Sequence, residues 1–335
     1  GLNQVKHYRK ICLTTTYLLL ATMLWGCGND SQTIPDTPKV TASPVEIRQE
    51  GVSTSASVPD FGSGTRDNTP LCLVPEADGI LEMRNDVAVI DYSHADQGYI
   101  CADYSGSVSK IKLILSGPDG TDYTYDLHGN GYEVFPLSAG SGSYKATIYE
   151  NISGTSYSTC LYAGFDAVLA NEFGPFLYPN QYVNFNADSK AVAKGAELAA
   201  GADTDLDVVI SIYDYITASI KYDYNKASDP PAGYVTDVDE ILTSGTGICL
   251  DYAALMSAML RSQQIPTRLE VGYAKDAYHA WISVYTEETG WLNGLIEFTG
   301  SSWTLVDPTF GANSSEKSLK KFIGDGTNYT LKKVY

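Results

Sequence analysis

The chain has 335 residues, of which 44% are hydrophobic, and its formal net charge at pH 7 is −18. This length and hydrophobic content suffice for two ordinary domains with packed cores, plus segments outside them. So large an excess of acid argues against binding to nucleic acid and against electrostatic docking on anionic lipid, because both partners are polyanions.

The first 27 residues are typical of a targeting segment. Basic residues at Lys6, Arg9 and Lys10 precede the apolar run ICLTTTYLLLATMLWG, and Cys27 follows. The stretch LWGC resembles the lipobox of bacterial lipoproteins, whose cysteine is lipidated, so we expect export and anchoring at Cys27 on the outer side of the bacterial cell membrane. The alternative is a single membrane-spanning helix, but about 16 apolar residues are short for the roughly 20 that a bilayer requires.

Residues 28–69 are rich in Ser, Thr, Pro, Gly and Asp. They show almost no periodic apolar pattern, so too few side chains are available to form a core. We expect this segment to be a disordered tether.

Residues 70–168 consist of short alternating runs separated by turn residues. In one run Ile111, Leu113 and Leu115 share one face and Lys112 lies on the other, which is the period-two pattern of a half-buried strand. Short strands at such regular spacing predict an antiparallel β-sandwich of the immunoglobulin-like type.

The pattern of residues 169–335 changes from helical to strand-like. Helical spacing extends over 188–201, 204–222, 237–245 and 247–264, and strand-like runs follow at 267–274, 278–285 and 303–310. Helices followed by strands in one domain predict an α+β fold, with helices on one side of an antiparallel sheet.

Of the six cysteines, two lie in the targeting segment. Cys72, Cys101 and Cys160 belong to the predicted sandwich, where we expect packed residues, and the sequence leaves their pairing open. Cys249 is the only cysteine after residue 168.

Cys249 follows Gly245 and Gly247 and lies in the first turn of a predicted helix. Free N–H groups and the positive end of the helix dipole favour thiolate there and lower the thiol pKa. The alternative is a small apolar residue that caps a core helix. The positions expected to form the buried stripe of this amphipathic helix are Ala253, Met256 and Leu260.

His279 is the only histidine after residue 168. Strand alternation in YHAWISVY places His279, Trp281 and Ser283 on one face. An imidazole on such a strand can act as base to a thiol across from it, although a lone histidine on a strand is more often structural. Asp307 ends the run WTLVD before a proline, and it either orients the imidazole or belongs to a turn.

Three stretches in order, GTGICLDYAALMSAMLRSQQIPTR, YHAWISVY and WTLVDPTF, resemble the signatures of the transglutaminase-like superfamily. The resemblance covers about residues 205–312. It implies a papain-like fold in which Cys249 is the nucleophile, His279 the general base and acid, and Asp307 the partner of His279.

Other site residues are expected from their positions. The Cys249 N–H is a candidate oxyanion donor, and Tyr222 is a second candidate, with a core tyrosine as the alternative. Asp251 matches the acidic position after the cysteine of the family, yet it also suits a helix N-terminus. Trp281 lies in the same motif as His279, and Trp303 in the same motif as Asp307. We expect both to be packing residues, with substrate contact as the alternative for Trp281.

No metal or cofactor is expected. The acids of 203–207 alternate as in a calcium loop, but Val208 and Asp214 occupy the positions that need Gly and Glu, so helix capping is preferred. No His/Cys cluster has the spacing of a zinc site.

Together these features predict an exported, lipid-anchored cysteine peptidase or amidase that forms a thioester with a peptide or protein substrate. Cell-wall and surface proteins are candidate substrates. Three alternatives stay open: a cross-linking transglutaminase, a surface binding protein on a transglutaminase-like scaffold, and a deglycosylating amidase.

Overall fold

The computed structural model describes residues 31–40, 64–274, 277–287, 289–298, 303–305 and 329–335. The chain divides into Gly1–Asp30 and Ser31–Tyr335, and every described residue belongs to the second unit. The targeting segment with Cys27, and Asp307, therefore lie outside the described residues. Within the described part, no helix combines the length and the apolar character needed to cross a membrane.

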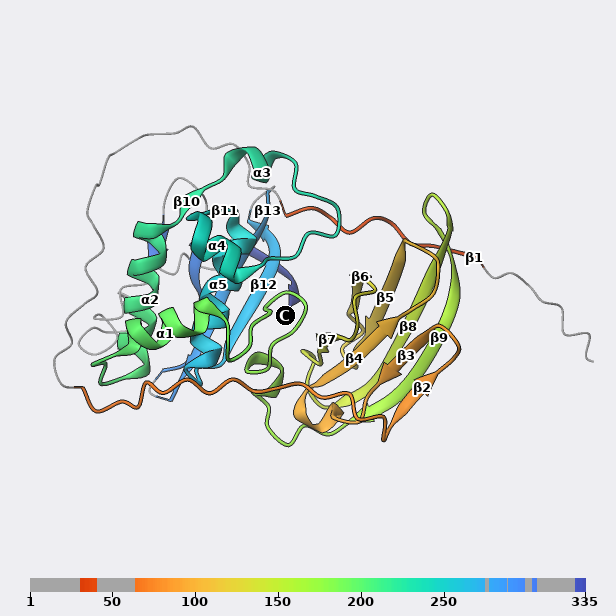
Figure 1. Cartoon of the computed structure of the whole chain (residues 1–335), viewed down its shortest axis with the longest axis horizontal. Helices are drawn as coiled ribbons and strands as arrows, with labels where there is room; N and C mark the ends of the chain where they lie inside the picture. The colour runs from red at the N-terminus through yellow and green to blue at the C-terminus, as the bar shows by residue number, and fades with distance from the viewer. Residues whose placement is uncertain (1–30, 41–63, 275–276, 288, 299–302, 306–328) are drawn as a thin grey trace, which may run out of the picture. The chain divides into compact units, whose positions relative to one another are not determined.

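The first part of the described chain consists of two antiparallel sheets (Figure 1). One has the order β1-β9-β8-β5-β6 and the other β2-β3-β4-β7. The strands are β1 (Ser31–Thr33), β2 (Glu82–Arg84), β3 (Ala88–Asp91), β4 (Tyr99–Tyr104), β5 (Ile111–Ser116), β6 (Asp122–Leu127), β7 (Glu133–Pro136), β8 (Gly142–Ser153) and β9 (Ser156–Ala167), with 3-10 turns η1 (Ala95–Gln97) and η2 (Gly174–Phe176). Alternate residues of both sheets meet in one core, as the period-two pattern predicts.

Strand β5 departs from the prediction on its second face. Ile111, Leu113 and Leu115 are buried as expected, but Lys112 is also only 1% exposed. Its Nζ lies 2.7 Å from Asp126 Oδ1 on β6. The expectation of a half-buried strand is wrong at Lys112, because this ion pair allows an amine to be covered that the binary pattern assigns to solvent.

Two described stretches of the expected tether contact the folded part. Strand β1 pairs with β9, and Ile34 packs in a small cluster with Tyr149 and Tyr157. Further along, Arg66 donates to Asp205 Oδ1 at 2.7 Å. These contacts connect the segment to both halves of the described chain.

The second part is a mixed α+β domain. Its helices are α1 (Lys190–Ala199), α2 (Asp205–Ser219), α3 (Tyr224–Ser228), α4 (Val238–Ser244) and α5 (Cys249–Ser262). Its sheet has the order β15-β14-β13-β12-β16, with β12 (Thr267–Ala274), β13 (Ala277–Thr286), β14 (Gly290–Phe298), β15 (Trp303–Leu305) and β16 (Tyr329–Val334), and a short parallel pair joins β10 (Lys221–Tyr222) to β11 (Thr246–Gly247). Thr204 and Asp207 form a capping box at the start of α2, which confirms helix capping there.

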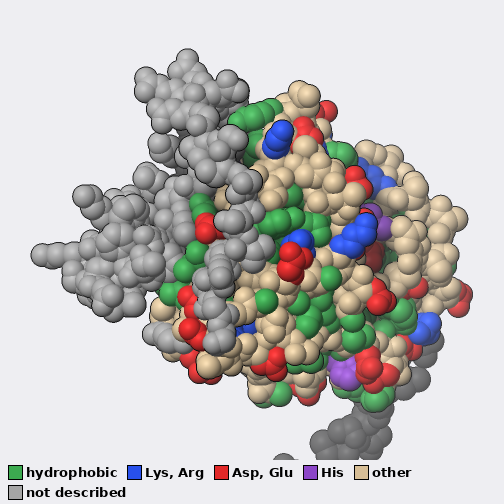
Figure 2. Space-filling model, turned by 60° about the vertical axis from the view of Figure 1, so that its left-hand side comes forward, with side chains coloured by type: hydrophobic (Ala, Val, Ile, Leu, Met, Phe, Trp, Pro, Cys, Tyr) green, Lys and Arg blue, Asp and Glu red, His purple; other side chains and the backbone are tan. Residues whose placement is uncertain are grey.

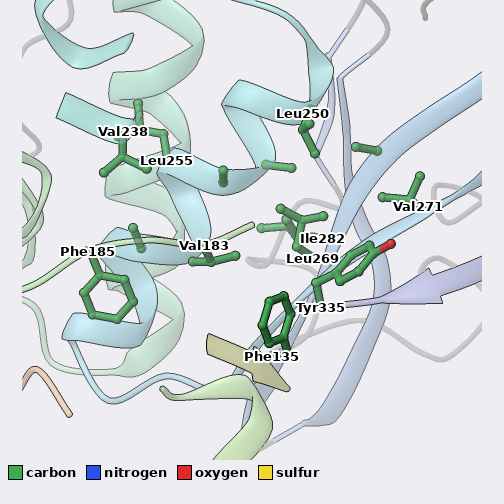
Figure 3. Close-up of a cluster of buried hydrophobic side chains, with 14 of the residues drawn as sticks. Phe135, Val183, Phe185, Val238, Leu250, Leu255, Leu269, Val271, Ile282 and Tyr335 are labelled. Atoms are coloured by element: carbon green, nitrogen blue, oxygen red, sulfur yellow. The ribbon is translucent and has the colours of Figure 1, made fainter. Parts of the chain in front are cut away.

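Helix α5 packs on β12, β13 and β14. Figure 3 shows its Leu250 and Leu255 in one buried cluster with Leu269 and Ile282 of the sheet. Every residue of α5 is buried, so the prediction of an amphipathic helix with one buried stripe is wrong. The helix lies at the centre of the domain, where neighbouring segments cover its other faces.

Burial of α5 on all sides requires partners for its polar residues. Arg261 is 1% exposed and donates to the backbone oxygens of Thr267, Tyr178 and Tyr335, with 2.8 Å to each of the last two. Burial lowers the Arg261 pKa to about 9. These bonds connect the end of α5 to β12 and to the residue that follows β16.

Strands β7, β14 and β16 and helix α3 were not expected from the sequence. β14 contains Gly and Asn, which are poor strand formers, and β16 lies in the stretch expected to be a tail. β14 obtains its structure from hairpin pairing with β13, and β16 from long-range pairing with β12.

Candidate active site

Cys249 is placed by the tight connection between α4 and α5. Helix α4 ends at Gly245 in the left-handed conformation, with φ of 65°. The parallel pairing of Tyr222 with Gly247 then leads the chain into Ile248 and Cys249, the first residue of α5. The Cys249 side chain is fully buried in this structure.

Gly247 is needed at this turn. A Cβ at residue 247 would lie 2.8 Å from Asp251 Cβ, closer than real Cβ atoms approach. We expect Gly247→Ala to destabilise the protein by about 1–3 kcal/mol, measured by urea unfolding. Gly164→Ala is the matched control, because the three atoms nearest to its Cβ would all belong to the far end of the flexible Tyr162 side chain. Equal stability of the two variants would contradict this role of Gly247.

Asp251 organises the first turn of α5. Its fully buried carboxylate accepts hydrogen bonds from the Ile248 N–H at 2.8 Å, the Tyr234 hydroxyl at 2.6 Å, the Thr236 hydroxyl at 2.7 Å and Lys226 Nζ at 3.0 Å. Lys226 also lies 4.0 Å from the centre of the Tyr234 ring. Asp251 thus connects the loop after α3 to the helix that carries Cys249.

The surroundings of Cys249 have opposing effects on the pKa of its thiol. Burial raises its pKa to about 11 and the Asp251 charge acts in the same direction, while the nearby Ala280 and Leu250 N–H groups and the Tyr222 hydroxyl lower it. The helix start therefore acts in the expected direction. The prediction of a lowered thiol pKa is nevertheless wrong, because burial of the side chain outweighs the effect of the helix start. At neutral pH an isolated thiol of this pKa would be thiolate in only about one part in 10⁴. The predicted role of Cys249 as a nucleophile therefore depends on a neighbouring base.

His279 lies on β13, opposite Gly272 of β12, and is 6% exposed. The residue after it, Ala280, directs its N–H to Cys249. The structure therefore brings the start of α5 to the part of β13 that carries His279.

The dependence of the thiol on this histidine is testable by alkylation. In His279→Ala we expect the rate at which iodoacetamide modifies Cys249 to rise about tenfold per pH unit toward pH 11, because burial holds the pKa there. In the wild type the rise should occur at lower pH. Peptide mapping by mass spectrometry measures the rate, and buried Cys101, whose pKa burial raises to about 12, is the internal control. Superimposable Cys249 profiles would contradict proton transfer to His279.

Tyr222 on β10 faces Cys249. Its buried hydroxyl lies near the side chain and the backbone N–H of Cys249 but forms no hydrogen bond of normal geometry with the described residues, and burial raises its pKa. The Tyr222 ring stacks on Tyr252, with ring centres 6.2 Å apart. The structure thus brings the two predicted oxyanion donors together.

Trp281 is 4% exposed and its indole N–H donates to Glu270 Oε2 at 2.7 Å. The Ser283 hydroxyl donates to the same oxygen at 2.9 Å, and burial raises the pKa of the Glu270 carboxyl. Trp281 is therefore a packed residue in this structure, and its indole is held by the Glu270 carboxylate on the neighbouring strand β12.

Strand β15 places Trp303–Leu305 beside β14, as the third motif predicts, but Asp307 lies outside the described residues. The sequence did not indicate Lys226, Tyr234 or Thr236 as residues of the site. Lys226 lies in the short helix α3 and Tyr234 and Thr236 in the loop after it, where no periodicity indicates a contact. Strand pairing with Trp281 was the only signal that could have identified Glu270.

One group of possible metal ligands lies among the described residues. Glu76, Asp78 and His94 have ligand atoms within 4.8 Å of one another, at the sandwich surface. His94 Nε2 is already 3.0 Å from Asp78 Oδ2, and all four described cysteines are free thiols.

Residues 192–294 match the model of the transglutaminase-like superfamily. No curated protein matches the chain. Among solved structures, the chain is similar to a candidate cysteine protease from Cytophaga hutchinsonii, with 15% identity, coverage of 76% of this chain and 74% of that one, and a TM-score of 0.35.

Two further structures share 12% identity with the chain. A candidate protease from Parabacteroides distasonis has a TM-score of 0.26, with 60% of this chain and 61% of that one covered. Red sea bream transglutaminase has a TM-score of 0.27, with 67% of this chain and 53% of that one covered. The chain thus spans less than two thirds of either protein.

All three TM-scores lie below 0.5, so the assignment rests on the family model. The matched range includes Cys249 and His279 and ends before Asp307. The chain therefore contains a domain of the transglutaminase-like superfamily at residues 192–294.

Proposed function

We propose that the protein is a cysteine acyl-transfer enzyme that hydrolyses peptide amides through a thioester on Cys249. The observation that supports this most is the convergence of three groups on the thiol: the Ala280 N–H beside His279, the Tyr222 hydroxyl and the first turn of α5. Nucleophile, base and oxyanion donors are the parts that acyl transfer requires.

The proposed reaction has two halves. His279 takes the thiol proton as Sγ attacks the amide carbon, the C–N bond then breaks, and His279 returns the proton to the departing amine. In the second half water attacks the thioester, loses a proton to His279, and the C–S bond breaks to release the acid and restore the thiol. Asp307 would hold the imidazole in the required tautomer and stabilise its cation.

The Tyr222 hydroxyl and the Cys249 N–H are the proposed oxyanion donors. We expect Tyr222→Phe to lower kcat by about 10² to 10³, with little change in KM, because the lost hydrogen bond forms in the transition state. Steady-state kinetics on a peptide amide measures this split. Tyr224→Phe is the control, because the Tyr224 ring lies beside the Tyr222 ring, with ring centres 5.0 Å apart. A rise in KM alone would assign Tyr222 to substrate binding.

For the first part of the chain we propose an immunoglobulin-like sandwich. From β3 onward, the strands follow the order A, B, C, C′, E, F and G, with β3-β4-β7 in one sheet and β6-β5-β8-β9 in the other. The Tyr144 hydroxyl, near the start of β8, donates to the Gly140 oxygen at 2.6 Å. This contact corresponds to the tyrosine corner of such folds.

Export and anchoring through lipidated Cys27 are part of the proposal and rest on the sequence of the targeting segment. They place the enzyme outside the bacterial cell membrane, with peptides or surface and cell-wall proteins as substrates. Figure 2 shows more acidic than basic side chains on the visible face, in line with the net charge of −18. Membrane fractionation of Cys27→Ser against the wild type tests the anchor: release of the variant into the soluble fraction is expected.

Amine attack on the thioester would give cross-linking instead of hydrolysis. Incubation of peptide mixtures with a labelled primary amine, read by mass spectrometry, separates the two reactions. Cleaved or deamidated peptides support hydrolysis, and amine-tagged peptides support a transglutaminase. If no product depends on Cys249, the domain is a binding scaffold.

A further inference from the structure

The loop between α3 and α4, residues 229–237, contacts both halves of the described chain. On one side, its Tyr234 and Thr236 hydroxyls donate to Asp251 Oδ1 in the first turn of α5. On the other side, Gly233 lies against the sandwich, where a Cβ at residue 233 would be 3.2 Å from Asp126 Oδ2. Gly233 also has a φ of 65°, so glycine suits this position twice. The loop therefore connects the sandwich to the helix that begins at the predicted nucleophile.

His128, directly after β6, joins the sandwich to this loop by a hydrogen bond. Its Nε2 lies 3.3 Å from the Gly233 carbonyl oxygen, and its Nδ1 lies 2.6 Å from Glu133 Oε1 on β7. Among the described residues, no other side chain of residues 70–168 forms a hydrogen bond with the loop. The imidazole thus bridges a carboxylate of the sandwich and the backbone of the loop.

Both partners of His128 are acceptors. Burial opposes ionisation of Glu133, but hydrogen bonds from His128 and from Gln181 Nε2, the latter at 2.9 Å, hold the pKa of its carboxyl below the usual value. A carboxylate and a carbonyl oxygen each need an N–H, and only the imidazolium ion has one on both ring nitrogens. When His128 loses a proton, Nδ1–H stays on the carboxylate, which is the stronger acceptor, and the Nε2 lone pair then faces the Gly233 oxygen.

The charges around His128 favour its cation. The hydrogen bond to Glu133 raises the His128 pKa, burial opposes this, and the Glu133 charge, the Gly233 oxygen and the Asp126 charge raise it further. The groove of about 490 Å³ that His128 lines with Gly233 also contains the charged residues Asp36, Lys39, Lys110, Lys112 and Asp126. Each of these lysines is paired with an aspartate: Lys39 with Asp229, Lys110 with Asp36 and Lys112 with Asp126. Histidine is the side chain in this set whose charge changes near neutral pH, so pH acts on the contact through His128.

We propose that His128 is a pH-dependent latch by which the sandwich holds the loop between α3 and α4. The imidazolium donates to Glu133 and Gly233 together, and the neutral imidazole releases Gly233, so the loop opens more often. Because the His128 pKa is raised in the folded protein, the latch is complete below the usual histidine pKa and is lost as pH rises through the raised value. The latch does not depend on the reaction at Cys249.

Hydrogen exchange of the full chain, followed by mass spectrometry, tests the latch without turnover. The reporter is a peptide that covers residues 229–236, in which the Tyr234 N–H donates to the Pro231 oxygen at 3.2 Å. NMR of the His128 ring protons locates the pH at which this residue titrates. As pH rises through that transition, the protection of the reporter, relative to the intrinsic exchange rate at each pH, should fall about three- to tenfold. The peptide of α1 is the internal reference and should keep its protection.

Three variants assign the effect to the latch. His128→Gln can donate to the Gly233 oxygen at every pH, so the reporter should stay protected without a pH step. His128→Phe has no donor, so its protection should be low at every pH. His94→Gln is the matched control, because His94 also pairs with a carboxylate, Asp78 Oδ2 at 3.0 Å, but does not line the groove beside the loop. It should retain the pH step of the wild type.

Three results would overturn the proposal. Protection in the wild type that does not change through the His128 transition would show that the contact with Gly233 does not hold the loop. A step that persists in both His128 variants would assign the pH dependence to another group. An equal fall in the α1 peptide would mean that pH changes the stability of the whole domain and not that of the loop.

Discussion

Cys249→Ala is expected to lower kcat for peptide-amide hydrolysis by at least about 10⁴, to the background of the assay, because no other group supplies the nucleophile. His279→Ala should cause a loss of the same order, since the thiol of pKa about 11 then has no base. The double variant should be no worse than either single variant, because residues that act as a unit are not additive. Product formation followed by mass spectrometry measures all three.

Cys160→Ala is the matched control for these variants. Cys160 is a free, half-buried thiol on β9 of the sandwich, so its removal should leave kcat unchanged. Circular dichroism of each variant establishes that the fold is retained. Turnover by folded Cys249→Ala at the wild-type rate would exclude the thioester mechanism.

Asp251→Ala is expected to cause the largest loss of stability, about 3–5 kcal/mol. The change leaves Lys226 without its carboxylate partner, although the Tyr234 hydroxyl still accepts from it, and removes the acceptor of three other donors around the first turn of α5. Asp251→Asn should cost less, because its oxygen can still face Lys226 and Ile248 while Tyr234 and Thr236 accept from its amide. Urea unfolding of both variants measures the difference.

Glu197→Ala is the control for the ion pair at Asp251. Glu197 lies 2.7 Å from Lys194, but its side chain is 55% exposed, so the loss should be at most about 1 kcal/mol. If Asp251→Ala were no more destabilising than Glu197→Ala, the buried network would not stabilise the start of α5. The kcat of Asp251→Asn, measured at a temperature where the variant is folded, then shows whether the Asp251 network also positions Cys249: a lower kcat is expected if it does.

The sequence by itself determined the elements with strong local periodicity. Helices α1, α2, α4 and α5 and strands β12 and β13 lie where their patterns predict, because each pattern alone requires one face to be covered. Cys249 and His279 were identified in the same way, as single residues at the ends of such elements. The match to the transglutaminase-like superfamily at 192–294 confirms the resemblance, while the roles of Cys249 and His279 stay predictions.

Long-range contacts decided the rest. The full burial of α5, the pairing of β16 with β12 and the burial of Lys112 all depend on segments distant in sequence, whose contacts leave no periodic signal. The Cys249 pKa is the clearest example. The local helix start lowers this pKa, but burial by the surrounding fold raises it by more than the helix start lowers it. Local chemistry predicts Cys249 as the nucleophile, and only the tertiary structure shows that its side chain is fully buried.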